Sequence, residues 1–180
     1  NGRVGLIVDN GCLFRGGREK GIRSRVVERN WVECVILLPG KLFYNTGAPG
    51  AILVFNKAKP GERRNKILFI NASNEFVPHP SVRRLNSLCR ENIAKIVDAY
   101  RSFADMDGFS RVVGLEEVRN NDYNLNVTLY VMPLEEEEPI DIVKEFSELK
   151  KLEEEREQIE RKLEEYISQL SQLMGGKDES

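Results

Sequence analysis

The sequence predicts an α/β fold, in which the later part of an open sheet ends in an antiparallel hairpin and is followed by a small α+β region and a long helix. Three observations predict it. Apolar runs at residues 3–8, 32–38 and 50–56 have the composition of strands, and the first two are typical of buried ones, the first on both faces. A helical pattern separates the first two runs but not the last two, which favours antiparallel pairing of the latter. After residue 134 the sequence becomes strongly acidic and helical.

The first strand and the helix after it open the predicted fold. The strand starts at Arg3, almost at the first residue of the sequence, so we expect the front half of the sheet to lie outside these 180 residues. A helix is predicted over residues 21–30, with Ile22 and Val26 on its inner face and Asn30 at its end. This helix would connect the first two strands.

The later elements are predicted from shorter patterns. Residues 66–71 form a fourth strand, for which an edge position stays open, and Pro78 marks a linker. Apolar residues at helical spacing predict a helix over residues 86–103. The remaining elements are short strands at residues 111–113 and 125–131 and a helical turn at residues 115–118.

Three regions are therefore predicted: the sheet over residues 1–75, the small α+β region over residues 76–134, and a long acidic helix over residues 135–180. Charge divides the chain at the last of these boundaries. Residues 1–134 contain 20 basic and 13 acidic residues, whereas residues 135–165 contain 6 basic and 14 acidic ones. A basic body with an acidic segment is typical of nucleic-acid contact combined with a separate interaction segment. Ordinary surface charge is the alternative.

Two rows of residues repeat along the last helix at heptad spacing. One row holds Leu149, Leu163 and Leu170 together with Arg156, and the other holds Leu152, Ile159, Tyr166 and Leu173. A narrow apolar stripe with charged outer faces indicates a coiled-coil or bundle seam that packs against another helix. Arg156 and Tyr166 on the seam disfavour a simple homodimer and favour a specific partner. A helix that lies on its own domain is the alternative.

Composition excludes several kinds of site. Three cysteines with irregular spacing form neither a disulfide framework nor a CxxC metal site. His79 is the only histidine, so neither a zinc site nor a Ser-His-Asp triad is expected, and we predict no metal. No apolar run approaches the roughly 20 residues that span a bilayer, so we expect no membrane contact. Because the cysteines form no disulfide framework, we expect a reducing, cytoplasmic location.

Two loops are the candidate functional sites. One spans residues 10–17 and the other residues 39–49, and each follows the carboxyl end of a strand, the edge at which ligands bind in open α/β sheets. Basic residues gather at the first loop. Arg15, Arg18 and Arg23 are candidates for contact with nucleic-acid phosphates, and a solvated helix face is the alternative.

Three runs of residues carry a resemblance to a known family. They are Asn-Gly-Cys-Leu-Phe-Arg-Gly-Gly at residues 10–17, Leu-Phe-Tyr-Asn-Thr-Gly at residues 42–47 and Asn-Asp-Tyr-Asn-Leu-Asn at residues 121–126. With these runs the chain resembles the modification (M) subunit of type I restriction-modification systems. That subunit belongs to the adenine-N6 DNA methyltransferases. The resemblance covers nearly the whole chain. It implies that the sheet is the C-terminal part of a Rossmann-like S-adenosylmethionine-dependent methyltransferase sheet.

The resemblance implies that the parent protein transfers a methyl group from S-adenosylmethionine to N6 of adenine in DNA. Two motifs of the family are missing from this sequence: the Gly-rich loop that binds the cofactor and the Asn-Pro-Pro-Phe or Asn-Pro-Pro-Tyr segment that positions the adenine. We therefore expect this segment to bind no cofactor and to be inactive by itself. Asp9 also departs from the family, which usually has proline there. The alternative function is a non-catalytic helical assembly module.

Phe43 is the leading site residue that the resemblance implies. It places Phe43 in the loop before the final strand of the sheet, where related enzymes put an aromatic ring against the flipped base. Tyr44 takes this role if the register differs by one residue. The other candidates for the target-base and DNA pocket are Asn45, Thr46, Asn10 and Phe14. A core phenylalanine and ordinary turn chemistry are the alternatives.

The resemblance also implies partners. M subunits of this family clasp the helical spacers of the specificity (S) subunit, which reads the DNA sequence, and the seam of the last helix suits such pairing. DNA and the specificity subunit are therefore the expected partners, and a restriction (R) subunit is a further candidate. A second copy of this chain, paired through an exposed first strand as a homo-oligomer, is another.

Overall fold

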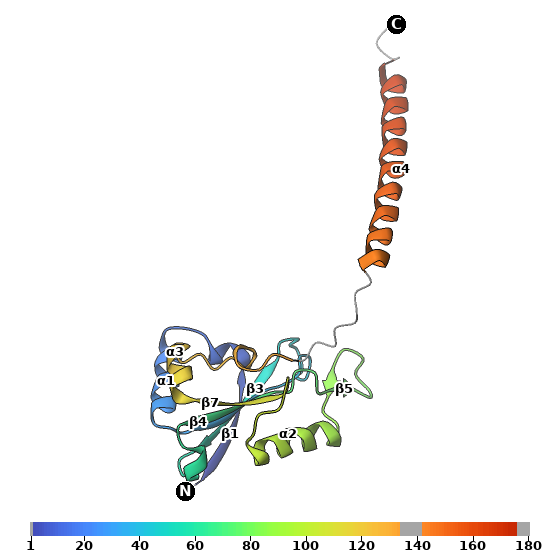
Figure 1. Cartoon of the computed structure of the whole chain (residues 1–180). Helices are drawn as coiled ribbons and strands as arrows, with labels where there is room; N and C mark the ends of the chain where they lie inside the picture. The colour runs from blue at the N-terminus through green and yellow to red at the C-terminus, as the bar shows by residue number, and fades with distance from the viewer. Residues whose placement is uncertain (1, 134–141, 176–180) are drawn as a thin grey trace. The chain divides into compact units, whose positions relative to one another are not determined.

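A five-stranded sheet in the order β1-β3-β2-β4-β7 lies at the centre of the first part of the chain (Figure 1). The computed structural model describes residues 2–133 and 142–175, and residues 1–134 and 135–180 form two compact units. The strands of the sheet are β1 (Arg3–Asp9), β2 (Val32–Leu37), β3 (Gly50–Asn56), β4 (Lys66–Asn71) and β7 (Ser110–Gly114). The predicted α/β class is confirmed. The boundary at residue 75 stays a prediction, although β7 from the later region joins the same sheet.

Strand direction sets the position of the loops. β2 runs parallel to β4, whereas β3 is antiparallel to both of its neighbours, β1 and β2. β1 and β2 therefore point the same way and end at the same edge of the sheet. The register of Leu37 opposite Ala51 confirms the predicted antiparallel pairing of the second and third strands. In the same way Asp9 lies opposite Gly50.

Helices cover both faces of the sheet and enclose two apolar cores. They are α1 (Arg18–Glu28), α2 (Arg90–Ser102) and α3 (Leu115–Asn120). On one face α1 and α3 pack over β2, where Val27 and Val118 join the core that contains Val35. On the other face α2 packs over β2, and Ile96 joins the core that contains Ile36 (Figure 1). Successive residues of β2 thus point to opposite cores, as the period of a strand requires.

Shorter elements connect this framework. The first unit contains a two-stranded ribbon of β5 (Val77–Pro78) and β6 (Asn86–Ser87) and the 3-10 helices η1 (Asn10–Leu13), η2 (Gly61–Arg63) and η3 (Val127–Leu129). The second unit contains α4 (Ile142–Gly175). None of the helices in the described residues is long and apolar enough to cross a membrane.

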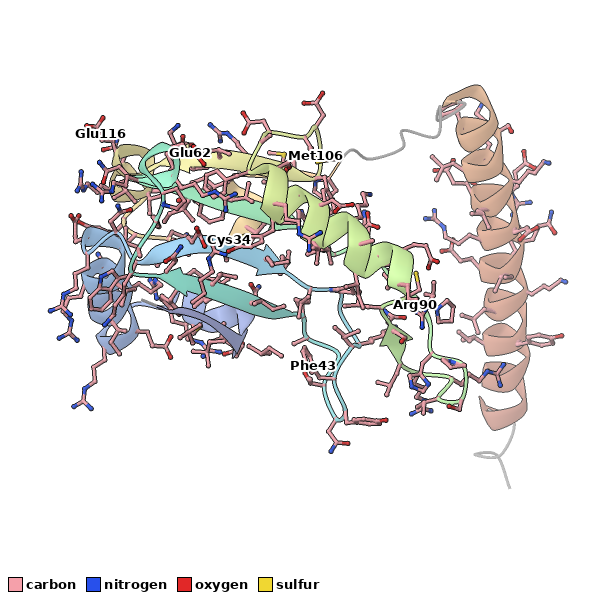
Figure 2. All side chains as sticks on the ribbon, turned by 90° about the horizontal axis from the view of Figure 1, so that it is seen from below. Cys34, Phe43, Glu62, Arg90, Met106 and Glu116 are labelled. Carbon is pink, nitrogen blue, oxygen red and sulfur yellow. The ribbon has the colours of Figure 1, made fainter. Side chains whose placement is uncertain are left out.

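Two helices differ in extent from the prediction. α1 starts at Arg18, three residues early, after Gly17 adopts a left-handed backbone with φ of 65°. Its buried residues are Arg23 and Val27. Of the two residues predicted to face inward, Val26 packs against the core but Ile22 is 54% exposed, so that prediction is only half right. α2 starts at Arg90 (Figure 2) and not at residue 86, because residues 86–87 pair with β5.

The strand predicted at residues 125–131 is wrong. This segment crosses one face of the sheet and contains η3, in which the Tyr130 N–H donates to the Val127 carbonyl. The Tyr130 ring stacks on Phe69 of β4 with 4.1 Å between ring centroids. Leu125 and Val127 are buried in the same core. Alternating apolar residues therefore fill a core here without any strand partner.

β1 is an open edge of the sheet. β1 and β7 are the two outer strands, which excludes an edge position for residues 66–71. Among the described strands, β1 pairs with β3 alone, and its side chains Val4, Leu6 and Ile7 are 58, 50 and 61% exposed. The prediction of a first strand buried on both faces is therefore wrong for these residues. An apolar open edge can accept another strand, because its outer backbone N–H and C=O groups are unpaired.

α4 carries the predicted heptad rows. Leu149, Leu152, Ile159 and Leu163 are each more than half exposed. The side chains of Leu170 and Leu173 and the predicted helix start at residue 135 lie outside the described residues. α4 is the one helix that the structure describes in the second unit, so the coiled-coil seam stays a prediction.

A buried carboxylate links several elements of the first unit. Glu33 on β2 is fully buried and accepts hydrogen bonds from the Tyr100 hydroxyl at 2.6 Å and the Asn56 amide at 3.1 Å. Its oxygens also lie 3.4 Å from the Arg3 guanidinium and 3.6 Å from that of Arg63. Burial raises the pKa of Glu33, but these four partners outweigh burial and hold the pKa below its ordinary value. The compensated charge joins β1, β2, β3 and α2.

Replacing Tyr100 with Phe should lower the free energy of unfolding by about 1.5–3 kcal/mol, because a hydrogen bond to a buried charged acceptor is lost. Urea denaturation of the chain measures this loss. Tyr44→Phe is the matched control, because Tyr44 is 73% exposed, and it should change the free energy by less than about 0.5 kcal/mol. Equal losses for the two variants would contradict the structural role of Glu33.

Candidate functional site

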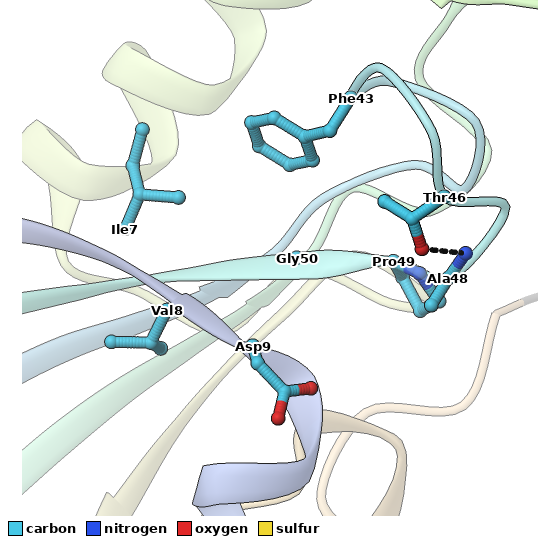
Figure 3. A pocket seen from close by; sticks show the side chains of 8 residues that line it. All are labelled: Ile7, Val8, Asp9, Phe43, Thr46, Ala48, Pro49 and Gly50. Carbon is cyan, nitrogen blue, oxygen red and sulfur yellow. Dashed lines mark hydrogen bonds between the residues drawn. The ribbon is translucent and has the colours of Figure 1, made fainter.

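Two loops meet at the edge where β1 and β2 both end. β1 leads through Asp9 into η1, and the loop over residues 38–49 connects β2 to β3. The Leu38 N–H donates to the Gly50 carbonyl at 2.9 Å and closes the base of this second loop. The cavity between the loops has a volume of about 260 Å³ and is lined by Ile7, Val8, Asp9, Phe43, Thr46, Ala48, Pro49 and Gly50 (Figure 3).

The Phe43 ring lies over Gly50. A Cβ added to Gly50 would lie 2.6 Å from Cε2 of Phe43, closer than side-chain atoms approach one another, so glycine at this position leaves room for the ring. Figure 3 shows the ring reaching across the start of β3 toward Ile7. Phe43 is half-buried, because it also packs against the core beneath α2. The ring thus forms one apolar wall of the cavity.

Hydrogen bonds within the loop hold this ring in place. The Lys41 N–H donates to the Gly47 carbonyl at 3.2 Å, and the Ala48 N–H donates to the Thr46 hydroxyl at 3.1 Å. Between them Asn45 adopts a left-handed backbone with φ of 63°, which asparagine tolerates better than most residues. The aromatic side chain therefore sits on a closed turn.

Asp9 is the one carboxylate among the residues that line the cavity. It accepts a hydrogen bond from the Gly11 N–H at 2.9 Å, which caps η1, and it pairs with Arg15 at 2.7 Å. The Gly11 N–H is the main cause that holds the pKa of Asp9 below its ordinary value, with Arg15 acting in the same direction. The carboxylate is therefore ionised and already engaged at neutral pH, which makes it a weak general base.

The structure brings two of the predicted pocket residues, Phe43 and Thr46, to the cavity. Tyr44 and Phe14 do not line it, and their side chains are 73 and 47% exposed. Asn45 belongs to the turn behind the ring.

Asn10 also lies off the cavity. Its side-chain oxygen is buried and has no hydrogen-bond partner within the described part of the chain.

The arginines of the first loop differ in how they are held. Arg18, at the start of α1, is exposed, and Arg15 is exposed but paired with two carboxylates. Arg23 is buried, and its guanidinium donates at 2.7, 2.8 and 3.1 Å to three backbone carbonyls, two in the first loop and one in the 121–126 run. Arg23 thus ties these two segments together, and of the three candidates for phosphate contact only Arg15 and Arg18 have exposed side chains.

Sequence reasoning missed several lining residues, among them Ile7, Asp9 and Gly50. Ile7 and Asp9 share one face of β1 because side chains alternate along a strand. Which face meets the second loop depends on the pairing of β1 with β3, two strands that lie far apart in the sequence. Gly50 carries a usable signal, since glycine at the start of an apolar strand often marks a close approach.

Neither loop offers a cradle for a nucleotide cofactor. The first closes into η1 under its Asp9 cap, and the second packs the Phe43 ring over Gly50. A cofactor cradle of the familiar type is a glycine-rich turn that leads directly from a strand into a helix. In the first loop η1 lies between β1 and the Gly16-Gly17 pair that opens α1. Within residues 2–133 and 142–175, no group of three or more His, Cys, Asp or Glu side chains could hold a metal ion.

Comparison with known proteins finds relatives over most of the chain. A profile of the family described as N-6 DNA Methylase matches residues 1–139. The type I restriction enzyme MjaVII methylase subunit of Methanocaldococcus jannaschii is 59% identical over 157 residues, which are 87% of this chain and 27% of that protein.

Two solved structures share the fold. The methyltransferase subunit of a type I restriction-modification system from Streptococcus thermophilus matches with a TM-score of 0.66 and 36% identity, over 73% of this chain and 27% of that one. A chain from a type I R-M system, described for its complex assembly and conformational transition, matches with a TM-score of 0.54 over 98% of this chain and 36% of its own length. At 23% identity the second likeness shows the fold alone. The chain thus spans about a quarter to a third of the length of these proteins.

Gly50→Ala should lower the free energy of unfolding by about 1–3 kcal/mol, because the new methyl group overlaps the Phe43 ring. In a Phe43→Ala background the same substitution should cost less than about 0.5 kcal/mol, since the overlap is gone. Urea denaturation of the four proteins of this double-mutant cycle measures the coupling. Gly47→Ala is the control in the same loop, where an added Cβ meets no atom within 4 Å. An equal cost of Gly50→Ala in both backgrounds would show that the ring does not rest on Gly50.

Proposed function

The chain belongs to the N-6 DNA methylase family, and on that premise we propose that it forms the carboxyl-terminal part of a type I restriction-modification methylase subunit. The complete subunit transfers a methyl group from S-adenosylmethionine to N6 of adenine in DNA. One observation carries the proposal: the Phe43 ring lines one side of a cavity at the edge of the sheet where β1 and β2 end. The chain spans 27% of the MjaVII subunit, so we assign the cofactor loop and the Asn-Pro-Pro segment to other parts of the complete protein.

Phe43 is proposed to stack on the target adenine. An enzyme reaches an exocyclic amine by moving the base out of the duplex and holding it between aromatic or apolar surfaces. The Phe43 ring and the Ile7 side chain offer such surfaces. Asp9 is occupied as the cap of η1, so these residues position a base and move no proton. Positioning of the two reactants is a large part of what methyl transfer requires.

The cofactor is assigned to residues outside this chain. S-adenosylmethionine supplies the methyl group, but the two loops at the cavity edge form no glycine-rich cradle that would fit it. We therefore place none of its contacts on these residues.

The open edge of β1 supports a longer sheet in the complete subunit. A further strand beside β1 would pair the free backbone groups and cover Val4 and Leu6, which are at least half exposed. If that strand ran parallel to β1, its carboxyl end would reach the same edge as Asp9. A second set of residues would then stand next to Phe43 and complete the base-binding site.

The second unit is proposed to join subunits. The exposed row of Leu149, Leu152, Ile159 and Leu163 on α4 suits a partner helix that covers it. We propose that this partner is the specificity subunit, that the assembly holds DNA, and that a restriction subunit joins it. The same row favours the second candidate function, an assembly module without methyl transfer. A measurement of methyl transfer by the complete subunit separates these two candidate functions, because an assembly module transfers no methyl group.

Phe43→Ala in the complete subunit, assembled with its partners, should reduce kcat/KM for methyl transfer to DNA by about 10- to 100-fold. Stacking on one base contributes about 1–3 kcal/mol. Phe43→Tyr retains the ring and should retain most of the activity. Transfer of tritium from labelled S-adenosylmethionine measures the rate, and the fluorescence of 2-aminopurine at the target position reports whether the base is flipped.

Tyr44→Ala is the control from the same turn and should change the rate by less than about 3-fold. A large loss for Tyr44→Ala with none for Phe43→Ala would move the stacking role to Tyr44. An unmodified assembly that transfers no label to DNA would contradict the proposed function and leave the assembly module.

Ile159→Glu combined with Leu163→Glu should abolish co-purification of the complete subunit with the specificity subunit, because the two charges would be buried against the partner helix. The urea midpoint of the first unit should stay unchanged. Gln158→Glu with Lys151→Gln is the control. It changes the net charge by the same amount as the double glutamate variant, but at heptad positions outside the two rows, and it should leave the complex intact. Undiminished co-purification of the double glutamate variant would contradict this interface.

A further inference from the structure

We infer that the β5–β6 ribbon and the loop over residues 38–49 form one phosphate-binding surface beside Phe43, which holds the sugar-phosphate backbone of DNA next to the flipped base. We call this surface, made of Lys41, Arg83 and Arg84, the basic rim. The inference rests on the proposed function, because it assigns a DNA contact to the edge that holds the base.

Hydrogen bonds tie the ribbon to the loop that carries Phe43. The Asn86 backbone N–H donates to the Lys41 carbonyl at 2.8 Å, and the Asn86 side-chain amide donates to the Gly40 carbonyl at 2.8 Å. Figure 2 shows the Phe43 loop projecting beside the segment that leads to Arg90. Arg83 and Arg84 precede Asn86 by three and two residues, so a contact close to the aromatic ring fixes their position.

The turn that presents the two arginines is itself closed. The His79 N–H donates to the Leu85 carbonyl at 2.9 Å, and the Leu85 N–H donates to the Val82 carbonyl at 3.0 Å. The His79 ring accepts hydrogen bonds through Nδ1 from the Ser81 and Val82 N–H groups at 3.2 and 3.1 Å. A turn fixed in this way loses little conformational entropy when its side chains bind a ligand.

The charge around the rim has one sign. Residues 34–61 contain three lysines and no acidic residue, and residues 76–90 contain three arginines and no acidic residue. Lys41, Arg83 and Arg84 are exposed, and the structure gives none of the three an ion pair with a described carboxylate. The nearest carboxylate before the ribbon in sequence, Glu75, is paired with Lys95.

This combination favours nucleic acid as the ligand. Exposed cations that lack carboxylate partners bind a polyanion without first breaking an ion pair, and contacts to phosphates position a duplex on a protein. A base that leaves the duplex needs its backbone held nearby, and the segment that carries Arg83 and Arg84 is hydrogen-bonded to the loop that carries Phe43.

The test uses the complete subunit assembled with its partners and a duplex that contains its methylation site. Arg83→Glu combined with Arg84→Glu should weaken DNA binding at least 10-fold near 0.1 M salt. The slope of log K against log salt should fall in magnitude by about 1–2, because each lost phosphate contact removes about 0.9. Binding of S-adenosylmethionine and the urea midpoint should be unchanged, which shows that the protein is folded. Arg83→Gln with Arg84→Gln provides the same test if the glutamate variant does not fold.

Arg64→Glu with Lys66→Glu is the matched control. It makes the same change in net charge at the opposite end of the sheet, where η2 leads into β4; Figure 2 shows Glu62 of η2 far from Phe43. The DNA affinity and the salt slope of this control variant should equal those of the unmodified protein. Arg83→Lys with Arg84→Lys keeps both charges and should also retain the slope.

The outcomes separate the rim from the proposed function. An unmodified assembly that methylates DNA, with affinity and slope unchanged in the Arg83 and Arg84 variants, overturns the basic rim and leaves the proposed function standing. An equal loss in the Arg64 and Lys66 control also overturns it, because overall charge would then explain the effect. An unmodified assembly that neither binds nor methylates DNA overturns both.

Discussion

The position of β3 between β1 and β2 is the constraint on which the rest of the structure depends. Because β3 runs against both neighbours, β1 and β2 point the same way and bring their carboxyl ends to one edge of the sheet. β3 begins at that edge, with Gly50 opposite Asp9. The turn after β1 and the loop after β2 therefore meet over the first residue of β3. The Phe43 ring rests there because Gly50 carries no side chain.

The two ends of this sheet use charge differently. At the end where β1 and β2 begin, Glu33 is buried and compensated by Arg3, Arg63, Tyr100 and Asn56, so its charge stabilises the junction of strands and helix. At the other end the cations on the loop and on the β5–β6 ribbon remain exposed. Compensated charges support a fold, whereas exposed cations are available to a polyanionic partner. Exposed cations also lie at the first end, among them Arg64 and Lys66, so the cavity beside Phe43, and not charge alone, marks the carboxyl ends of β1 and β2 as the functional edge.

Local sequence patterns predicted the elements whose partners are near in the chain. The strands β2, β3 and β4 and the antiparallel hairpin follow from apolar runs and from the absence of a helix between β2 and β3. The 125–131 segment was mistaken for a strand because alternating apolar residues serve a strand face and an irregular core segment equally well. Arg23 was assigned to the surface because composition does not reveal that three backbone carbonyls enclose its guanidinium. Phe43 and Thr46 were found through the family resemblance, whereas Ile7 and Asp9 depend on the long-range pairing of β1 with β3.

The central claim, that this chain belongs to a working adenine methyltransferase, is tested most directly by the methylated base itself. Unmethylated DNA is incubated with the complete subunit, its specificity subunit and S-adenosylmethionine that carries a deuterated methyl group. The DNA is then digested to nucleosides for mass spectrometry. Deuterated N6-methyldeoxyadenosine is the predicted product. Label on cytosine, or no label on any base, would contradict the claim.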